Sequence, residues 1–243
     1  MYKRFTFAVM AVIISIANQK GGVGKTTVTA MLANALAGDP FGYRVYVADC
    51  DAQQSLIRRR LADQRERDDP APYKIEHLNI ATLQKEIPAL DKQNDFIFID
   101  LPGRLDSTSA DDQHTIAKYL QYPDILLLPF TPGNYSLEST LDYLRFVMKV
   151  RQQRSATPRP LVLIGFVNLY EGRTLDDRVL LEEIAELQTM VNVPFINSRL
   201  QRFALFRNVD TFTSFYDPAT TDKAKTNFTT FLNELKNDLW QRK

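Results

Sequence analysis

The sequence Lys20-Gly21-Gly22-Val23-Gly24-Lys25-Thr26-Thr27 closely follows an apolar run over residues 12–17. Its three glycines allow backbone N–H groups to turn inward around phosphate oxygens. We expect a helix to start near Lys25, and its positive N-terminal end adds to an anion site. A strand, a glycine-rich loop and a helix in this order predict a phosphate-binding loop.

The loop departs from the general pattern G-x-x-x-x-G-K-[ST] at its first position, where this chain has Gln19. The second half, Gly24-Lys25-Thr26, is intact. Lys25 is expected to reach the β- and γ-phosphates, and the Thr26 hydroxyl to bind Mg²⁺. An additional lysine, Lys20, points to one particular kind of nucleotide switch. The alternative is a glycine-rich turn without a ligand, which the order of strand, loop, lysine and helix disfavours.

Composition and charge are ordinary for a globular protein. The 243 residues suffice for one large α/β domain, which we expect over 1–243. Hydrophobic residues make up 44% and charged residues 24%, and the net charge is +1, so a nucleic acid would have to meet a local patch. The single cysteine, Cys50, excludes an intrachain disulfide and a cysteine metal cluster, and fits a reducing cytoplasm.

The N-terminus resembles a signal peptide, because Lys3 and Arg4 precede an apolar run over 5–17. We reject this interpretation, since the run leads into the phosphate loop and cleavage there would destroy the site. Met10 is an alternative start, which makes residues 1–9 a dispensable extension. No stretch of the sequence has the length and apolarity expected of a membrane span.

Short β-rich runs alternate with amphipathic helical segments, which predicts an α/β fold with a mostly parallel, twisted sheet and helices on both faces. Most of the runs are continuously apolar, as in buried parallel strands. Strands are predicted at 12–17, 44–49, 96–100, 125–129, 161–167 and 193–196. Helices are predicted at 26–36, 54–67, 115–121, 136–151, 175–187 and 219–240.

Three carboxylates follow predicted strands, whose carboxyl ends form the ligand crevice of such a sheet. Asp49 and Asp51 end the second run, and Asp100 ends the run 96–100. Asp100 is suited to hold Mg²⁺, often through water, with Asp49 as a second metal candidate. Asp51 is better placed to orient an attacking water. The alternative for each aspartate is a turn or cap residue.

Three segments resemble the nucleotide motifs of the ParA/MinD family of deviant-Walker ATPases. They are residues 20–27, Asp49-Cys50-Asp51-Ala52-Gln53 and Phe98-Ile99-Asp100-Leu101-Pro102. A fourth, Leu128-Pro129-Phe130-Thr131-Pro132, resembles a family segment near the nucleotide base. The family often has proline where this chain has Ala52 and Gly103, which concerns the shape of loops rather than their chemistry.

The resemblance implies an ATP-driven homodimer that also uses Mg²⁺. Two subunits would enclose two ATP molecules, Lys20 of each would reach the partner's nucleotide, and slow hydrolysis would release the dimer. Lys20, Lys25 and Asp51 are then the catalytic candidates. Asn168 ends a predicted strand where some relatives contact adenine, and a turn-capping asparagine is the alternative.

Two stretches without acidic residues, 143–170 and 187–209, favour DNA as a partner. Paired in a dimer, they could hold phosphate backbones without reading bases. A solvated helix face and loop is an equal alternative. The candidate DNA contacts are Arg199, Arg202, Arg207, Lys149, Arg151 and Arg154.

An apolar stripe with helical spacing lies near the C-terminus. Its members are Phe228, Phe231, Leu232, Leu235 and Leu239, followed by Trp240 and Lys243. Such a stripe can bind a membrane surface. We expect it instead to pack on the sheet, as most amphipathic helices do.

Together these features predict a ParA-like ATPase that positions or segregates DNA of a plasmid or other mobile element, in the cytoplasm and on the nucleoid. The resemblance implies a ParB-like or cargo-bound activator. The alternative is the same switch placing a protein complex, such as a conjugation apparatus or a division regulator at the membrane, without DNA binding. A metabolic kinase is disfavoured, because it has no evident need for Lys20, and an iron–sulfur protein is excluded by the single cysteine.

Overall fold

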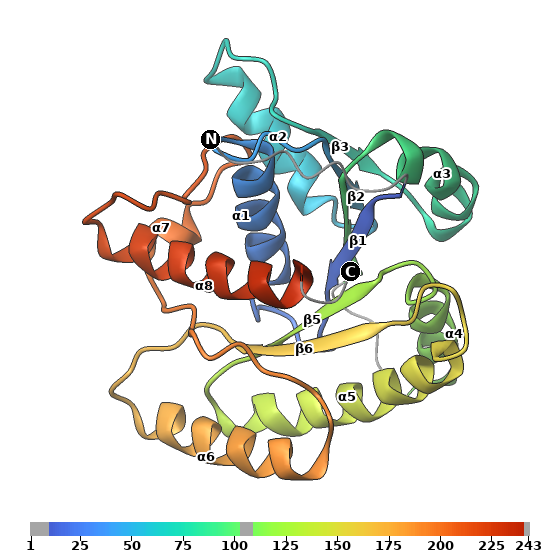
Figure 1. Cartoon of the computed structure of the whole chain (residues 1–243), viewed down its shortest axis with the longest axis vertical. Coiled ribbons are helices and arrows are strands. Elements are labelled where there is room, and N and C mark those ends of the chain that lie inside the picture. Colours follow the sequence, from blue (N-terminus) through green and yellow to red (C-terminus); the bar gives the residue numbers. More distant parts are fainter. Residues whose placement is uncertain (1–9, 103–108, 241–243) are drawn as a thin grey trace.

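The computed structural model describes residues 10–102 and 109–240. The expected extension 1–9, Gly103 and Lys243 lie outside them. The described residues form one six-stranded, all-parallel sheet in the order β3-β2-β4-β1-β5-β6 (Figure 1). The predicted α/β fold is therefore confirmed. The strands are β1 Val12–Ile16, β2 Val45–Asp49, β3 Lys74–His77, β4 Phe96–Asp100, β5 Ile125–Phe130 and β6 Val162–Val167.

Helices cover both faces of the sheet (Figure 1). The helices of one face are α1 Lys25–Ala37, α2 Ser55–Arg65, α7 Ala204–Arg207 and α8 Lys223–Trp240. Those of the other face are α3 Ile80–Gln93, α4 Ala110–Tyr119, α5 Asn134–Arg154 and α6 Leu175–Met190.

Each face of the sheet has its own apolar core, because successive side chains of a strand point to opposite faces. Ile14 and Ile16 of β1 pack in the core that contains α1 and α8, and Ile13 packs in the other core. Phe98 and Ile99 of β4 divide in the same way. Burial on both faces explains why these strands are continuously apolar in the sequence.

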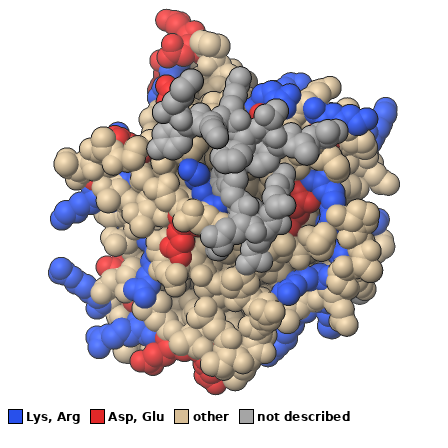
Figure 2. Space-filling model, viewed as in Figure 1, with Lys and Arg blue, Asp and Glu red and all other residues tan. Residues whose placement is uncertain are grey.

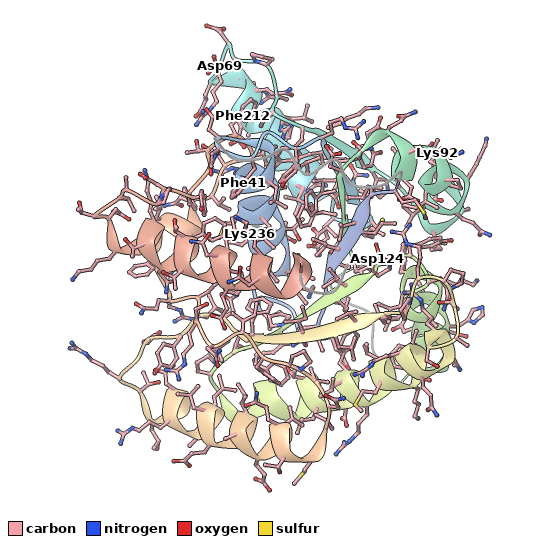
Figure 3. The ribbon with its side chains drawn as sticks, in the orientation of Figure 1. Phe41, Asp69, Lys92, Asp124, Phe212 and Lys236 are labelled. Atoms are coloured by element: carbon pink, nitrogen blue, oxygen red, sulfur yellow. The ribbon has the colours of Figure 1, made fainter. Side chains whose placement is uncertain are left out.

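The apolar stripe of α8 packs on the sheet, as expected. Its buried side chains are Phe228, Phe231, Leu232 and Leu235. The Phe231 ring lies 5.4 Å from that of Phe166 in β6, centroid to centroid. Lys236 of α8 places its Nζ 4.3 Å from the ring centroid of Phe41, just after α1 (Figure 3). In the described part of the chain, none of the helices has the length and apolarity needed to cross a membrane.

The predicted strand at 193–196 is wrong. This segment runs beside β6 but makes only an isolated bridge, between Gly165 and Phe195. Pro194 has no N–H to extend the pairing, although its carbonyl accepts from the Gly165 N–H at 2.8 Å. The Phe195 ring packs directly over Gly165, where a Cβ would come within 2.5 Å of it.

Three elements were not predicted: β3, α3 and the four-residue helix α7. β3 reads Lys-Ile-Glu-His, and its polar side chains suit the edge of the sheet, where one side of the strand faces solvent. Helix α3 contains Pro88, which normally disfavours a helix interior. Its start is fixed by Asn79, whose side chain accepts from the Thr82 N–H at 2.9 Å.

The register of the strands gathers the sequence motifs at one edge of the sheet. Asp100 of β4 is the register partner of Asp49 in β2 and of Ile16 in β1. The loop after Ile16 leads into α1 at Lys25. Because parallel strands share their carboxyl edge, the glycine-rich loop and the carboxylates lie together there.

Candidate nucleotide-binding site

The glycine-rich loop has the backbone that its sequence predicts. Gly22 and Gly24 adopt left-handed conformations, with φ of 77° and 87°. A Cβ added at Gly21 or Gly22 would meet no atom within 4 Å, so this part of the backbone is open to a ligand. Thr26 and Thr27 lie in the first turn of α1, where free N–H groups favour an anion.

Lys25 is buried beneath this loop, with 7% of its surface exposed. Its Nζ donates to the Lys20 carbonyl at 2.9 Å. Burial lowers the pKa of Lys25, and the charges of Asp100 and Asp51 oppose that shift. The ammonium group is therefore held by a neutral acceptor, which a phosphate oxygen can replace with a stronger, charged one.

Thr26 and Asp100 bring together two oxygen groups of the kind that bind a magnesium ion. The Thr26 hydroxyl donates to Asp100 Oδ2 at 2.9 Å. The other oxygen, Oδ1, is buried and has no hydrogen-bond partner among the described residues. Burial raises the pKa of Asp100 to about 7. An orphaned carboxylate oxygen beside a hydroxyl fits Mg²⁺, which prefers oxygen ligands.

Asp49 has a different environment from Asp100, although the two are register partners. Both of its oxygens accept backbone N–H groups, from Asp51 on one side and from Leu56 and Ile57 on the other, at 3.1–3.3 Å. Burial raises the pKa of Asp49, and these three hydrogen bonds oppose the shift. This geometry makes Asp49 an anchor for the start of α2 and gives no support to its expected role as a metal ligand.

Asp51 follows β2 at the carboxyl edge of the sheet and is half-buried. One of its oxygens accepts from the Gln53 N–H at 2.8 Å, which fixes the turn after β2. Its charge acts on Lys25. The expected role of Asp51 in orienting water stays a prediction.

Two buried asparagines hold the loop from opposite ends. Asn168, after β6, donates from Nδ2 to the Val23 carbonyl at 2.8 Å, and its amide would meet a Cβ at Gly24 within 2.5 Å. Asn18, after β1, accepts from the Lys20 N–H at 2.9 Å. Asn168 thus contacts the loop backbone here, and its expected contact with adenine stays a prediction. Asn18 was not predicted, although a polar residue between a buried strand and this loop was a usable signal.

A hollow of about 290 Å³ adjoins the loop on the side of β5 and β6. Its walls come from the loop, from Thr131 and Pro132 after β5, and from the turn after β6. In that turn Leu169 adopts a left-handed φ of 57°, a strained conformation of the kind found at functional sites. A larger hollow of about 800 Å³ lies at the amino end of β6, far from these motifs along the strand, and is not a candidate.

Most cations of the stretch 143–170 make contacts within the fold. Arg154 is buried, and its guanidinium donates to the carbonyls of Leu120, Pro123 and Arg159. The prediction that Arg154 contacts DNA is therefore wrong. Arg151 donates to the Asn192 carbonyl. Lys149 is exposed on α5.

The stretch 187–209 keeps more of its cations at the surface. Arg199 lies over the Tyr170 ring, 4.9 Å from its centroid, and Arg207 is exposed. Arg202 pairs with Glu171 at 2.9 Å beside the hollow, so acid from outside the stretch offsets it. In the view of Figure 2, cations form separate groups with acids between them.

Arg199 lines a second, polar groove of about 850 Å³ between the segment 197–203 and the start of α8. Hydroxyl and amide side chains make most of its walls, with Lys223 as a further cation and no carboxylate among the lining residues. Such donors are those that bind phosphate backbones.

Residues 14–209 match the family described as the CobQ/CobB/MinD/ParA nucleotide binding domain. The chain is also similar to Maintenance of carboxysome distribution protein A of Halothiobacillus neapolitanus, with 24% identity over 198 residues that cover 82% of this chain and 83% of the relative.

Two solved structures share the fold. One is a plasmid partition protein from Borrelia burgdorferi, with a TM-score of 0.63 and 16% identity, covering 94% of this chain and 99% of that one. The other is cobyrinic acid a,c-diamide synthase from Mycobacterium smegmatis with bound ADP and magnesium. Its TM-score is 0.67 and its identity 18%, covering 96% of this chain and 97% of that one.

Proposed function

The chain belongs to the CobQ/CobB/MinD/ParA family of nucleotide-binding domains, and we propose that it is an ATPase of the ParA type that binds duplex DNA without sequence preference when ATP is bound. The observation that carries the nucleotide part is the Thr26–Asp100 pair beside the buried Lys25, under an open glycine-rich loop. The M. smegmatis structure of the same fold holds ADP and magnesium.

The residues of the site divide the work as follows. Lys25 exchanges the Lys20 carbonyl for phosphate oxygens. Thr26 and Asp100 would hold Mg²⁺, which neutralises charge on the phosphates. Asp51, half-buried after β2, orients the attacking water. The loop N–H groups and the first turn of α1 position the phosphates.

Lys20 is proposed to act across a homodimer. Its backbone is held on both sides, by Asn18 at the N–H and by Lys25 at the carbonyl. Its ammonium group makes no hydrogen bond or ion pair with another residue of the described part of the chain. A fixed backbone with an uncommitted side chain suits a lysine that reaches a nucleotide in the partner subunit.

The polar groove with Arg199 and Lys223 is the surface that we propose for DNA. It lacks carboxylates and offers hydroxyl and amide donors, which bind phosphates regardless of sequence. The N-terminal end of α8 lies at this groove, where the Asp222 carboxylate accepts the Lys225 N–H, so the positive charge of the groove comes from Arg199 and Lys223. The cargo would be a plasmid or another mobile element, as the B. burgdorferi protein of the same fold is named for plasmid partition.

The test is binding to random-sequence duplex DNA with ADP and with a slowly hydrolysed ATP analogue, at two salt concentrations. We expect binding only with the analogue, weakened by salt. Lys20→Ala should lose the DNA binding seen with the analogue. Arg199→Glu should weaken the affinity for DNA by at least about tenfold. Lys149→Glu, an equal charge change on α5, should have little effect on that affinity. Equal affinity with ADP and the analogue would contradict the switch.

The runner-up function is the same switch acting on a protein assembly. It is favoured by the similarity to a protein named for maintenance of carboxysome distribution. A chain of this kind would dimerise with ATP yet ignore DNA, or bind lipid vesicles if it acts at a membrane. In either case we propose that a ParB-like or cargo-bound activator stimulates hydrolysis.

A further inference from the structure

We propose that Asn18 is a positioning residue that couples the glycine-rich loop to helix α5 through Thr140. The proposal rests on the proposed nucleotide site and adds a route by which its occupancy reaches another part of the fold. Asn18 is 4% exposed and stands between the end of β1 and Lys20.

The Asn18 side chain joins the glycine-rich loop to two elements that lie more than 100 residues away in sequence. Its Nδ2 donates to the Pro129 carbonyl in β5 and to Thr140 Oγ1 in α5, each at 2.9 Å. Its Oδ1 accepts from the Lys20 N–H, also at 2.9 Å. Both donors of the amide are thus in use, and the acceptor holds the first peptide of the loop.

The hydrogen bonds continue from Asn18 to the lysine that would bind phosphate. The Lys20 carbonyl accepts from Lys25 Nζ at 2.9 Å. The Lys20 residue is therefore held from one side by Asn18 and from the other by Lys25. When Lys25 turns to a phosphate, the Lys20 carbonyl loses its hydrogen bond. The hydrogen bond from the Lys20 N–H to Asn18 then remains to hold this residue.

A buried amide resists losing its partners, because an unsatisfied buried polar group is costly. A shift of Lys20 therefore moves Asn18 together with the groups that it holds. Of these, Pro129 is fixed in β5, which pairs with strands on both sides. Thr140 lies in the first half of α5, which packs on the sheet through apolar side chains such as Tyr143 and Leu144. Arg154 anchors the far end of this helix, so its first half is the part that can adjust.

The start of α5 lies close to the proposed site by a second route. The residues just before it, Thr131 and Pro132, line the hollow beside the glycine-rich loop. Gly133, the next residue, has a φ of 115° that other residues rarely adopt. A change at the loop can thus reach α5 both through Asn18 and through this turn, and the test separates the two.

The test compares hydrogen exchange of the α5 amides with ADP and with a slowly hydrolysed ATP analogue plus Mg²⁺. We expect the wild-type chain to show slower exchange in the first half of α5 with the analogue. Thr140→Val removes the acceptor for Asn18 while keeping the shape of the side chain. This variant should bind both nucleotides within about twofold of wild type and lose the difference in α5 exchange.

Thr29→Val is the matched control, since Thr29 is also a buried helical threonine but its hydroxyl has no hydrogen-bond partner among the described residues. It should keep both nucleotide binding and the exchange difference. A full exchange difference in Thr140→Val would overturn the proposal and leave the turn 131–133 as the route. No difference in the wild-type chain, with nucleotide bound, would overturn it while sparing the proposed function. Absence of nucleotide binding by the wild-type chain would overturn both.

Discussion

Arg159 at the amino ends of the strands and Lys25 at the carboxyl ends are both largely withdrawn from water, but among the described residues only Arg159 has carboxylates within ion-pair distance. Arg159 donates to Asp124, shown at the start of β5 in Figure 3, and to Asp91. The same carboxylates accept the N–H groups of Ile13 and Ala11, at the start of β1.

At the carboxyl ends of the strands, the buried charged groups are not fully paired among the described residues. Asp100 keeps one oxygen unpartnered within the described residues, and the Lys25 ammonium bonds to a neutral carbonyl. Buried charge without a charged partner costs stability, and it persists where function requires it. The comparison therefore separates one end of the sheet that stabilises the fold from another that is reserved for a ligand.

The largest effect is expected at the ligand end. Lys25→Ala should weaken binding of ATP by at least about 100-fold, because the charge that meets the phosphates is lost. The free energy of unfolding of the nucleotide-free chain should stay the same or rise, since a buried ammonium group is removed. Isothermal titration and denaturant unfolding measure the two quantities. A large loss of stability would contradict the division between the two ends.

Arg159→Ala should show the opposite behaviour. Removing the arginine leaves Asp124 and Asp91 partly buried without their cation, and we expect a loss of about 2–3 kcal/mol in unfolding free energy. Nucleotide affinity of the folded protein should stay within about twofold of wild type. Denaturant unfolding and titration at a temperature where the variant is folded check this. A strong loss of affinity in the folded variant would show that the two ends are not independent.

Asp100 should make the free energy of unfolding depend on pH. The carboxyl pKa is about 7 in the folded chain and 3.8 in the unfolded chain. Between these values the folded state keeps a proton that the unfolded state has lost, so raising the pH from about 4 to about 7 should lower the unfolding free energy of the nucleotide-free protein. Asp100→Asn should lack this contribution and be more stable at pH 8, by about 1–2 kcal/mol.

That gain is smaller than the full linkage value, because the buried amide of the variant still needs partners. The same variant should lose Mg²⁺-dependent hydrolysis. Urea unfolding across this pH range, for both proteins, separates the Asp100 contribution from other titrating groups. Parallel pH profiles for the two proteins would rule out the assignment.

The smallest effect is expected for an exposed ion pair at the amino ends of the strands. It tests whether an ion pair there must be buried in order to stabilise the fold. Arg44 pairs with Asp95 at 2.8 Å near the amino end of β2, but 61% of the arginine side chain is exposed. Arg44→Ala should therefore cost only about 0.5 kcal/mol of unfolding free energy. A cost as large as that of Arg159→Ala, in the same unfolding assay, would mean that solvent screening matters less at this edge than we suppose.

The parts of the fold that follow from local patterns could be predicted from the sequence. The glycine-rich loop, the apolar strands and Asp100 at a strand end needed no knowledge of distant residues. β3 could not be recognised, because an edge strand has few of the buried positions that produce an apolar run. α3 was hidden by Pro88, which its other contacts outweigh.

Side-chain roles that depend on distant partners were not predictable. The stretch 143–170 contains no acid, yet folding brings Asp91 and Asp124 to Arg159, and three carbonyls enclose the Arg154 guanidinium. The same holds for Asn18, whose partners in β5 and α5 lie more than 100 residues away in sequence. Charge patterns along a chain therefore predict surface function poorly where tertiary contacts decide which charges remain free.

Gly165 has a consequence for the solubility of this protein. Its missing side chain allows the Phe195 ring to lie against β6, and the segment 194–200 bonds to the outer edge of that strand at Gly165 and Val167. Without this cover, the outermost strand would present unpaired backbone groups to other molecules, which is how sheets join edge to edge into aggregates. The absence of a side chain at Gly165 thus helps to protect the edge strand β6 from pairing with other chains.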